Sequence, residues 1–348
     1  MIDGSRWGGY LIEPIAGMVS RDASPEAVAA TLGERAGIAQ DAIAKIEPGL
    51  SYYPSPGGID EVVHALFVEM AKPFAESPLS PRLSGFSTSG EVREFDAQDL
   101  LRAAHVGVLP EARLETLVYA LMDKLGIPPD PFIGEPIELA VAPNLYALRR
   151  TSIHDLLARP PTHPFVRTEG RAGYLRLIRS VFADQTEEAG RPRTLAEQDL
   201  EFVVPRERSV NTVVALPVFR DGQPFIGVET RLLPVPQIHE GNARILTAPA
   251  WRLGRDVATL DQAKAFVAER LRVSVEDVVG LGAAYFPSAG ITPERVHPYA
   301  VRLSQPCEEL GCDFVPLSDV RCHRHALRDG HLLVAALRLT HALGLYST

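Results

Sequence analysis

Two short segments of the chain carry a serine, a glutamate and a histidine at identical spacing: Ser55, Glu61 and His64 in the first, and Ser288, Glu294 and His297 in the second. Hydroxyl, carboxylate and imidazole groups can bind a polar ligand or transfer protons. A serine nucleophile also needs a base that a third group orients. No acidic residue is evidently placed to orient His297 beside Ser288. We therefore expect no serine nucleophile, and both histidines to be hydrogen-bonded structural residues.

The two segments belong to a longer internal repeat. Tyr52–Gly57 (YYPSPG) recurs as Tyr285–Gly290 (YFPSAG), at an offset of 233 positions. An apolar, strand-like stretch follows each copy, and then a helix with leucines at spacings of three and four that ends in glycine, over 114–126 and 332–344. A further helix is predicted before each copy, over 25–36 and 260–271. The pattern predicts an internal duplication.

The middle of the chain differs in composition from the two copies of the repeat. Consecutive prolines at 128–129 and 160–161 interrupt it. An amphipathic helix is predicted over 173–188, and two short strands over 137–142 and 145–148. Further on, residues 211–219 and 224–231 are rich in β-branched residues and flank Asp221-Gly222, which predicts a β-hairpin.

Composition excludes several classes of function. The 348 residues include 35 basic and 44 acidic residues, for a formal net charge of −9. Binding to nucleic acid or anionic membranes requires a concentrated positive surface, so neither partner is expected. No apolar run approaches the roughly 18 residues of a membrane span. The first nine residues lack the features of a secretion signal, and we expect a cytoplasmic protein.

One group of residues near the C-terminus could bind a metal by residue type: Cys307, Cys312, Cys322, His323, His325 and His331. Three cysteines form no disulfide framework, which is typical of a reducing compartment. Their spacing matches no zinc motif closely. We therefore expect a surface loop between Cys307 and Cys312 rather than a zinc site.

The order of strands, helices and aromatic-Pro-Ser loops resembles the Nudix hydrolases, in particular their ADP-ribose pyrophosphatase branch. Glu13–Met18 is similar to the segment that leads into the family's catalytic box, and Thr230–Val235 to its second strand and the following turn. The resemblance covers roughly residues 1–127 and 200–345. It implies that the two loops approach a substrate, which makes these residues candidates for ligand binding: Ser55, Glu61, Arg231, Ser288, Gly290 and Glu294.

The resemblance also implies a magnesium site, but its carboxylates are largely missing. In the second copy Trp251 occupies the glycine position of the box, and Glu269 is its one remaining acid, next to Arg270. In the first copy Glu34 remains, next to Arg35. Magnesium is usually held by one or two carboxylates plus substrate oxygens, and an adjacent guanidinium competes with it.

Glu269 and Glu34 are therefore weak metal candidates, magnesium is disfavoured, and we expect no particular cofactor. Arg35 and Arg270 could instead bind phosphate directly. The simpler interpretation, which we favour, is that each is a solvated helix residue paired with a nearby acid.

These patterns together predict an α+β protein. Two Nudix-like α/β/α sandwich domains, each with a mixed sheet between helices, are expected over 1–127 and 206–348, joined by a proline-rich segment over 128–205. The first copy lacks the opening hairpin of the fold, so we hypothesise that residues 137–148 fold back to supply its strands. Alternatively, the second copy or another subunit supplies them.

Two functional classes remain open. In the first, the protein binds a nucleotide or a nucleoside-diphosphate-linked ligand resembling ADP-ribose without metal-dependent hydrolysis, or serves as a structural or assembly partner. In the second, it is an active pyrophosphohydrolase or a repurposed enzyme, with Glu269, Glu294, Glu61 or Arg231 in catalysis. We favour the first class. The family resemblance further implies a homodimer.

Overall fold

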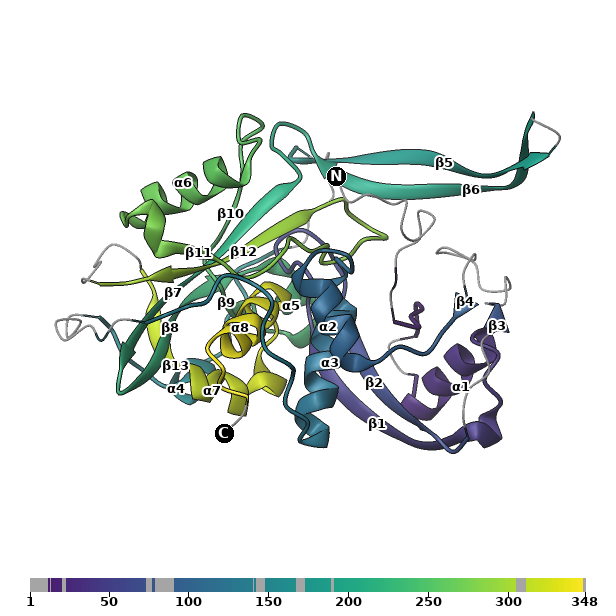
Figure 1. Cartoon of the computed structure of the whole chain (residues 1–348), viewed down its shortest axis with the longest axis horizontal. Helices are drawn as coiled ribbons and strands as arrows, with labels where there is room; N and C mark the ends of the chain where they lie inside the picture. The colour runs from purple at the N-terminus through teal and green to yellow at the C-terminus, as the bar shows by residue number, and fades with distance from the viewer. Residues whose placement is uncertain are drawn as a thin grey trace.

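The computed structural model describes residues 12, 14–20, 23–72, 77–78, 91–139, 141, 148–166, 173–188, 191–304 and 311–346. Within these ranges, the side chains of Arg35, Glu91 and residues 77–78 and 180–200 are left out of the description. The fold is α+β, as the sequence predicts (Figure 1). Among the described residues, no helix is both long and apolar enough to cross a membrane.

A seven-stranded mixed sheet forms the second half of the chain (Figure 1). Its main path is β11 (Val278–Gly280), β12 (Arg295–Arg302), β7 (Asn211–Asp221), β8 (Gln223–Leu232) and β13 (Asp313–Pro316). β9 (Arg244–Thr247) pairs with β8, and β10 (Ala250–Arg252) pairs with β7. β12 and β7 are parallel. The β7–β8 hairpin turns at Gly222, whose φ of +69° suits the predicted Asp-Gly turn.

Helices cover both faces of this sheet. Side chains alternate along β7, so that Val213 and Ala215 pack in one apolar cluster and Val214 and Leu216 in another. The first cluster includes α6 (Leu260–Leu271), and the second includes α8 (Gly330–Ala342). The sequence predicted both helices. α6 begins with a capping box, in which Thr259 and Gln262 satisfy each other's backbone N–H groups.

The first half repeats part of this arrangement in the same order. α1 (Pro25–Arg35), η2 (Gln40–Ala42), β1 (Ile43–Tyr52), β2 (Val63–Met70) and α3 (Ala112–Leu125) correspond to α6, η4 (Val275–Asp277), β11, β12 and α8. β1 pairs with β2 antiparallel, as β11 does with β12. α2 (Ala97–His105) and the short strands β3 (Ser77–Pro78) and β4 (Glu91–Val92) lie between β2 and α3 in the chain.

The two halves share one apolar core. The cluster around α8 also contains Leu50 and Tyr52 of β1 and Ala112 of α3. Within it, Arg338 on α8 is fully buried and pairs with Glu115 on α3, through Nε–Oε1 at 2.6 Å and Nη2–Oε2 at 2.7 Å. Such a buried pair must be satisfied completely, because an unpaired charge in the interior is strongly destabilising.

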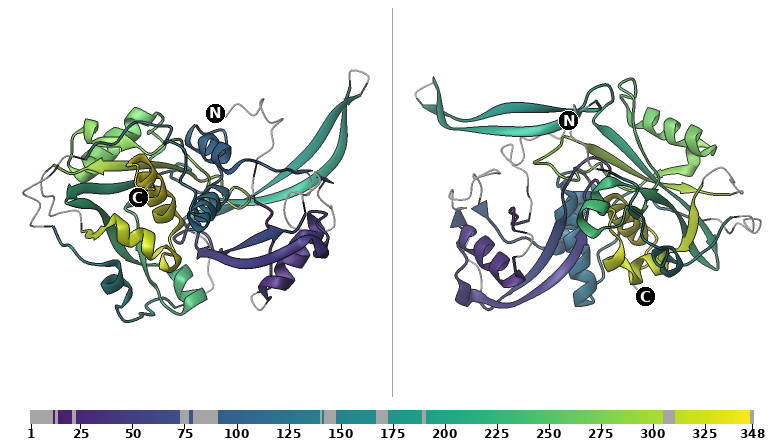
Figure 2. Two further views of the ribbon diagram at one scale, coloured as in Figure 1. Left: turned by 60° about the horizontal axis from the view of Figure 1, so that its bottom comes forward. Right: turned by 180° about the vertical axis from the view of Figure 1, so that it is seen from behind.

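The helix predicted over 173–188 is wrong. β5 (Leu175–Glu188) pairs over its whole length with β6 (Arg191–Pro205), and the hairpin extends away from the rest of the protein (Figures 1 and 2). Apolar residues such as Ile178 and Val181 fit helical spacing, but β-branched and aromatic residues also favour strands. The pairing with β6 satisfies the backbone hydrogen bonds that a helix would otherwise form.

The strands predicted over 137–142 and 145–148 are also not observed where they can be examined. Residues 137–139 form no strand, and 142–147 lie outside the described residues. Val141 forms an isolated bridge with Arg220 of β7, and Arg150 forms one with Phe314 of β13. This segment therefore contacts the sheet of the second half, and its described residues do not extend the β1–β2 pair.

Four short helices complete the description: α4 (Ile153–Leu157), α5 (Pro234–Glu240), α7 (Leu317–Cys322) and η6 (Arg324–Ala326).

Candidate functional site

Each aromatic-Pro-Ser loop bonds to the long helix of the opposite half. The Tyr53 N–H donates to the carbonyl of Arg328 at 2.7 Å, and the Gly330 N–H donates to the carbonyl of Tyr53 at 2.9 Å, at the start of α8. In the other half, Phe286 makes the same exchange with Pro110 and Ala112 at the start of α3, at 2.7 and 3.1 Å. Tyr53 and Phe286 hold equivalent positions in the repeat, so the exchange is reciprocal.

The polar residues of the two loops are exchanged in the same way. Ser55 donates to Glu294 Oε2 at 3.0 Å, and Ser288 donates to Glu61 Oε2 at 2.8 Å. The serine of each loop therefore binds the glutamate that follows the other loop. The sequence identified all four residues, but not this crossing.

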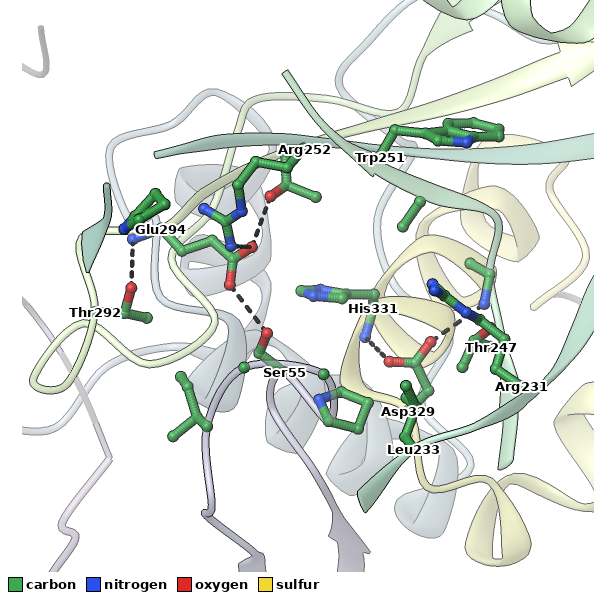
Figure 3. Close-up of a pocket in the computed structure, with 18 of the residues that line it drawn as sticks. Ser55, Arg231, Leu233, Thr247, Trp251, Arg252, Thr292, Glu294, Asp329 and His331 are labelled. Atoms are coloured by element: carbon green, nitrogen blue, oxygen red, sulfur yellow. Dashed lines mark hydrogen bonds and ion pairs between the residues drawn. The ribbon is translucent and has the colours of Figure 1, made fainter. Parts of the chain in front are cut away.

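A cavity of about 320 Å³ lies beside the first of these pairs. Loop residues 55–59, the base of the β5–β6 hairpin and the strands β7 to β10 line it, together with the start of α8. Figure 3 shows its main polar side chains, Ser55, Arg231, Thr247, Arg252, Thr292, Glu294, Asp329 and His331. Apolar residues such as Leu233 and Val203 form the rest of the wall. This volume is at the lower end of the range of small-molecule sites, roughly 300–1,000 Å³.

Glu294 is buried, and its carboxylate is fully engaged within the protein. Besides Ser55, it accepts hydrogen bonds from Thr212 Oγ1 at 2.6 Å and Arg252 Nη2 at 2.7 Å (Figure 3). The positive charge of Arg252 is therefore balanced by Glu294. We infer that Glu294 shapes the wall and holds the first loop in place.

Asp329 is the second buried carboxylate at the cavity. It caps the N-terminus of α8 by accepting from the backbone N–H groups of His331 and Leu332, and it also accepts from that of Ala248 at 3.2 Å. Burial raises the pKa of Asp329, and the three N–H groups and the nearby His331 oppose this shift. Through these hydrogen bonds, the carboxylate of Asp329 connects the start of α8 to the loop after β9.

Three other polar side chains at the cavity retain unused hydrogen-bonding groups. Arg231 is exposed, and no described residue forms a hydrogen bond or ion pair with its guanidinium. Thr247 is 4% exposed, and its hydroxyl has no hydrogen-bond partner within the described part of the chain. His331 is 7% exposed; its Nδ1 lies 3.2 Å from the Tyr285 hydroxyl, and no described residue bonds its Nε2. In Figure 3, Arg231 and His331 both extend into the space between the walls.

Trp251 is among the residues that line the cavity, but its indole is directed away from the cavity's polar groups. It contacts the α6 side of the sheet, with Val257 and Phe266 in the same cluster. Figure 3 shows the indole directed away from Glu294 and His331. The indole is therefore mainly a packing group. Tyr174, at the base of the hairpin, also lines the cavity and is 52% exposed.

The candidate box residues lie outside this cavity. Glu269 and Arg270 are exposed on α6, where the guanidinium of Arg270 stacks over Phe266 at 5.6 Å. Glu34 is exposed on α1. Arg35 also belongs to α1, but its side chain is outside the described part. Gly290 is exposed and does not line the cavity. Of the predicted site residues, Ser55, Arg231 and Glu294 are at the cavity, while Glu61 and Ser288 form the reciprocal pair.

Within the described ranges, no group of three or more histidine, cysteine or acidic side chains is arranged to hold a metal ion. Cys307 lies outside those ranges, Cys312 is buried and Cys322 is exposed. His331, which belongs to the same stretch of sequence, instead lines the cavity. His64 and His297 are hydrogen-bonded as predicted, to Ser51 at 3.0 Å and Asn211 at 3.3 Å.

Sequence reasoning missed most of the cavity wall, namely Tyr174, Thr212, Thr247, Arg252, Thr292 and Asp329. Asp329 alone carried a local signal, because an aspartate directly before a predicted helix is a typical N-cap. Thr212 and Thr247 are at ordinary strand positions, and their role depends on which strands pair.

No model of a known protein family matches the chain, and no curated protein matches it significantly.

Proposed function

We propose that the protein binds a nucleotide or a nucleoside-diphosphate-linked molecule resembling ADP-ribose in the cavity beside Ser55, without metal-dependent hydrolysis. The observation that carries the proposal is the division of polar groups around this cavity. Its buried carboxylates, Glu294 and Asp329, are occupied by internal hydrogen bonds. The guanidinium of Arg231, the hydroxyl of Thr247 and Nε2 of His331 form no hydrogen bond with the residues that the structure describes. These groups suit an anionic, oxygen-rich ligand.

The remaining wall is suited to the uncharged part of such a ligand. Leu233, Val203 and Pro205 offer apolar surface, and Tyr174 offers an aromatic ring. Aromatic rings bind planar bases by stacking in a way that does not require a particular base. The combination of a few polar groups with an apolar wall is the usual composition of a small-molecule site.

The proposed absence of metal chemistry rests on the placement of the acids. Magnesium catalysis of pyrophosphate cleavage needs carboxylates that can bind the ion beside the substrate. Glu269 and Glu34 are exposed on outer helices and do not line the cavity. The acids that do line it are already engaged. Hydrolysis at a rearranged metal site is therefore the second candidate function, and the experiment below tests for it.

We further propose that the chain is a tandem of two Nudix-like domains, the first incomplete. The repeated order α1, β1, β2, α3 and α6, β11, β12, α8 supports it, as does the sandwich of α6, sheet and α8. The resemblance also leads us to propose a homodimer. An assembly role without a ligand is the outcome expected if no nucleotide binds.

The experiment combines a binding screen with an activity assay. Thermal unfolding is followed with ADP-ribose, AMP and adenosine in EDTA, and release of AMP from ADP-ribose is followed with Mg²⁺ or Mn²⁺. We expect ligand-dependent increases in Tm and no AMP release. Metal-dependent AMP release that Glu269→Gln abolishes would instead show an active hydrolase.

A further inference from the structure

We propose that Arg231, Thr247 and His331 form a subsite that binds a phosphate group of the ligand directly, without a metal ion. The inference rests on the proposed function and identifies the part of the ligand that this side of the cavity recognises.

The three side chains are brought together by the pairing of β8 with β9. Arg231 is opposite Ile245, and Glu229 is opposite Thr247, so Arg231 and Thr247 are diagonal neighbours on one face of the pair. The residue after Thr247, Ala248, donates its N–H to Asp329, which in turn accepts from the backbone of His331. Figure 3 shows the three residues around Asp329 on one side of the cavity.

Thr247 provides the strongest indication of a ligand. The residue is 4% exposed, yet its hydroxyl has no hydrogen-bond partner among the described residues. A buried hydroxyl without a partner is destabilising, and such groups in folded proteins usually have a partner. The partner here would be a ligand oxygen in the cavity that Thr247 lines.

The donor groups on this side suit an anion, although the carboxylates of Asp329 and Glu229 lie nearby. Arg252, the other arginine of the cavity, is neutralised by Glu294. The charge of Asp329 is compensated by three backbone N–H groups, two of them at the N-terminus of α8. Arg231 forms no ion pair with a described residue, although it lies near Glu229, where its charge opposes the rise in the pKa of that carboxyl that burial causes. Its guanidinium supplies a planar set of donors that matches phosphate.

His331 completes the set of donors through its orientation. The Tyr285 hydroxyl lies 3.2 Å from Nδ1 and holds the ring in place. When that hydroxyl donates to Nδ1, the neutral imidazole carries its proton on Nε2, which faces the cavity. The subsite then offers donors from Arg231, Thr247 and His331 to one phosphate.

The test measures binding of AMP, ribose 5-phosphate and adenosine in EDTA by calorimetry. Thr247→Val and Arg231→Gln are compared with the wild type, and Arg220→Gln serves as the matched control because Arg220 is exposed at the far end of β7. We expect each subsite variant to weaken AMP and ribose 5-phosphate by about tenfold, the usual effect of losing a hydrogen bond to a charged group. Adenosine binding and the control should be unchanged.

A second readout separates binding from folding. Because Thr247→Val removes an unpaired buried hydroxyl at nearly constant volume, it should raise the Tm of the ligand-free protein by about 1–3 °C while it weakens phosphate binding. A purely structural role would move stability and affinity in the same direction, and that result would overturn the subsite.

The outcomes distinguish this inference from the proposed function. If AMP binds equally well to the wild type and both variants, the subsite is wrong and the nucleotide-binding proposal stands. If only ribose 5-phosphate binds and the variants weaken it, the subsite stands and the nucleotide assignment fails. If none of the three compounds binds, both are wrong.

Discussion

Ser55 and Glu294 are 239 positions apart in the chain, yet the serine hydroxyl donates to the glutamate at 3.0 Å inside the protein. Ser288 and Glu61 form the equivalent bond in the opposite direction at 2.8 Å. The serine of each loop therefore depends on the other half of the chain for its carboxylate partner. The cavity next to Ser55 is built from both halves, and it requires the whole chain.

The reciprocal bonds can be measured by two double-mutant cycles. Ser55→Ala with Glu294→Gln and Ser288→Ala with Glu61→Gln should each give a coupling free energy of about 1–2 kcal/mol, as expected for hydrogen bonds to charged acceptors. Urea unfolding provides the free energies. Additive effects within both pairs would show that the exchange contributes nothing to stability.

The buried ion pair between Arg338 and Glu115 should dominate the polar contribution to the shared core. Removing one partner leaves a buried charge, so Glu115→Ala should lower the free energy of unfolding by about 3–5 kcal/mol. Replacing both, with Arg338→Met and Glu115→Leu, should recover part of this loss, because the carbonyls of Leu281 and Ala283 still lose the donor that Arg338 Nη1 provides.

The matched control for that pair is Lys72 with Asp41, which are 3.7 Å apart with side chains 69% and 76% exposed. Lys72→Ala should change the free energy of unfolding by less than about 1 kcal/mol. Equal effects at the buried and exposed pairs would contradict the structure.

Acid should destabilise the protein through His105. This side chain is 3% exposed, and burial, with the charges of Arg338 and His341, lowers its pKa to about 2. The unfolded chain binds a proton at this histidine below about pH 6.5, whereas the folded protein does not. Its contribution to stability is therefore complete above that pH and is lost progressively as the pH falls.

Urea unfolding at pH 7, 6, 5 and 4 tests this effect. Below pH 6 the wild type should lose up to about 1.4 kcal/mol per pH unit from this one group. His105→Gln, which can keep a side-chain N–H near Tyr119, should show a shallower dependence. Parallel pH profiles for the two proteins would mean that His105 titrates normally.

Tyr174 should recognise the base of a bound nucleotide. Tyr174→Ala should weaken AMP by about 1–3 kcal/mol, the usual range for stacking on an aromatic ring, and leave ribose 5-phosphate unaffected. Tyr174→Phe retains the ring and should bind AMP like the wild type. Calorimetry with both compounds checks this. A loss of ribose 5-phosphate binding in Tyr174→Ala would instead assign Tyr174 to the phosphate side.

The sequence was sufficient to predict elements with strong local patterns. The helices over Pro25–Arg35, Ala112–Leu125, Leu260–Leu271 and Gly330–Ala342 all have apolar residues at helical spacing, and the Asp-Gly hairpin has a specific turn. The β5–β6 hairpin was missed because its apolar residues satisfy either period, and its identity as a strand depends on a partner further along the chain.

The candidate site was only partly predictable for a related reason. Ser55, Arg231 and Glu294 stand in recognisable motifs, but Thr212, Thr247 and Arg252 are ordinary strand residues. They reach one cavity because β7, β8, β9 and β10 pair in a particular register. No local sequence pattern encodes that register. None encodes the hydrogen bonds by which the serine of each loop binds the glutamate after the other loop.

Titration of ADP-ribose into the wild-type protein by calorimetry, once in EDTA and once in Mg²⁺, tests the central claim most directly. A cavity whose ligand is held by Arg231 and neighbouring hydrogen-bond donors should give the same Kd in both buffers, with no AMP formed. Binding that appears only with Mg²⁺, accompanied by conversion of ADP-ribose to AMP, would contradict it.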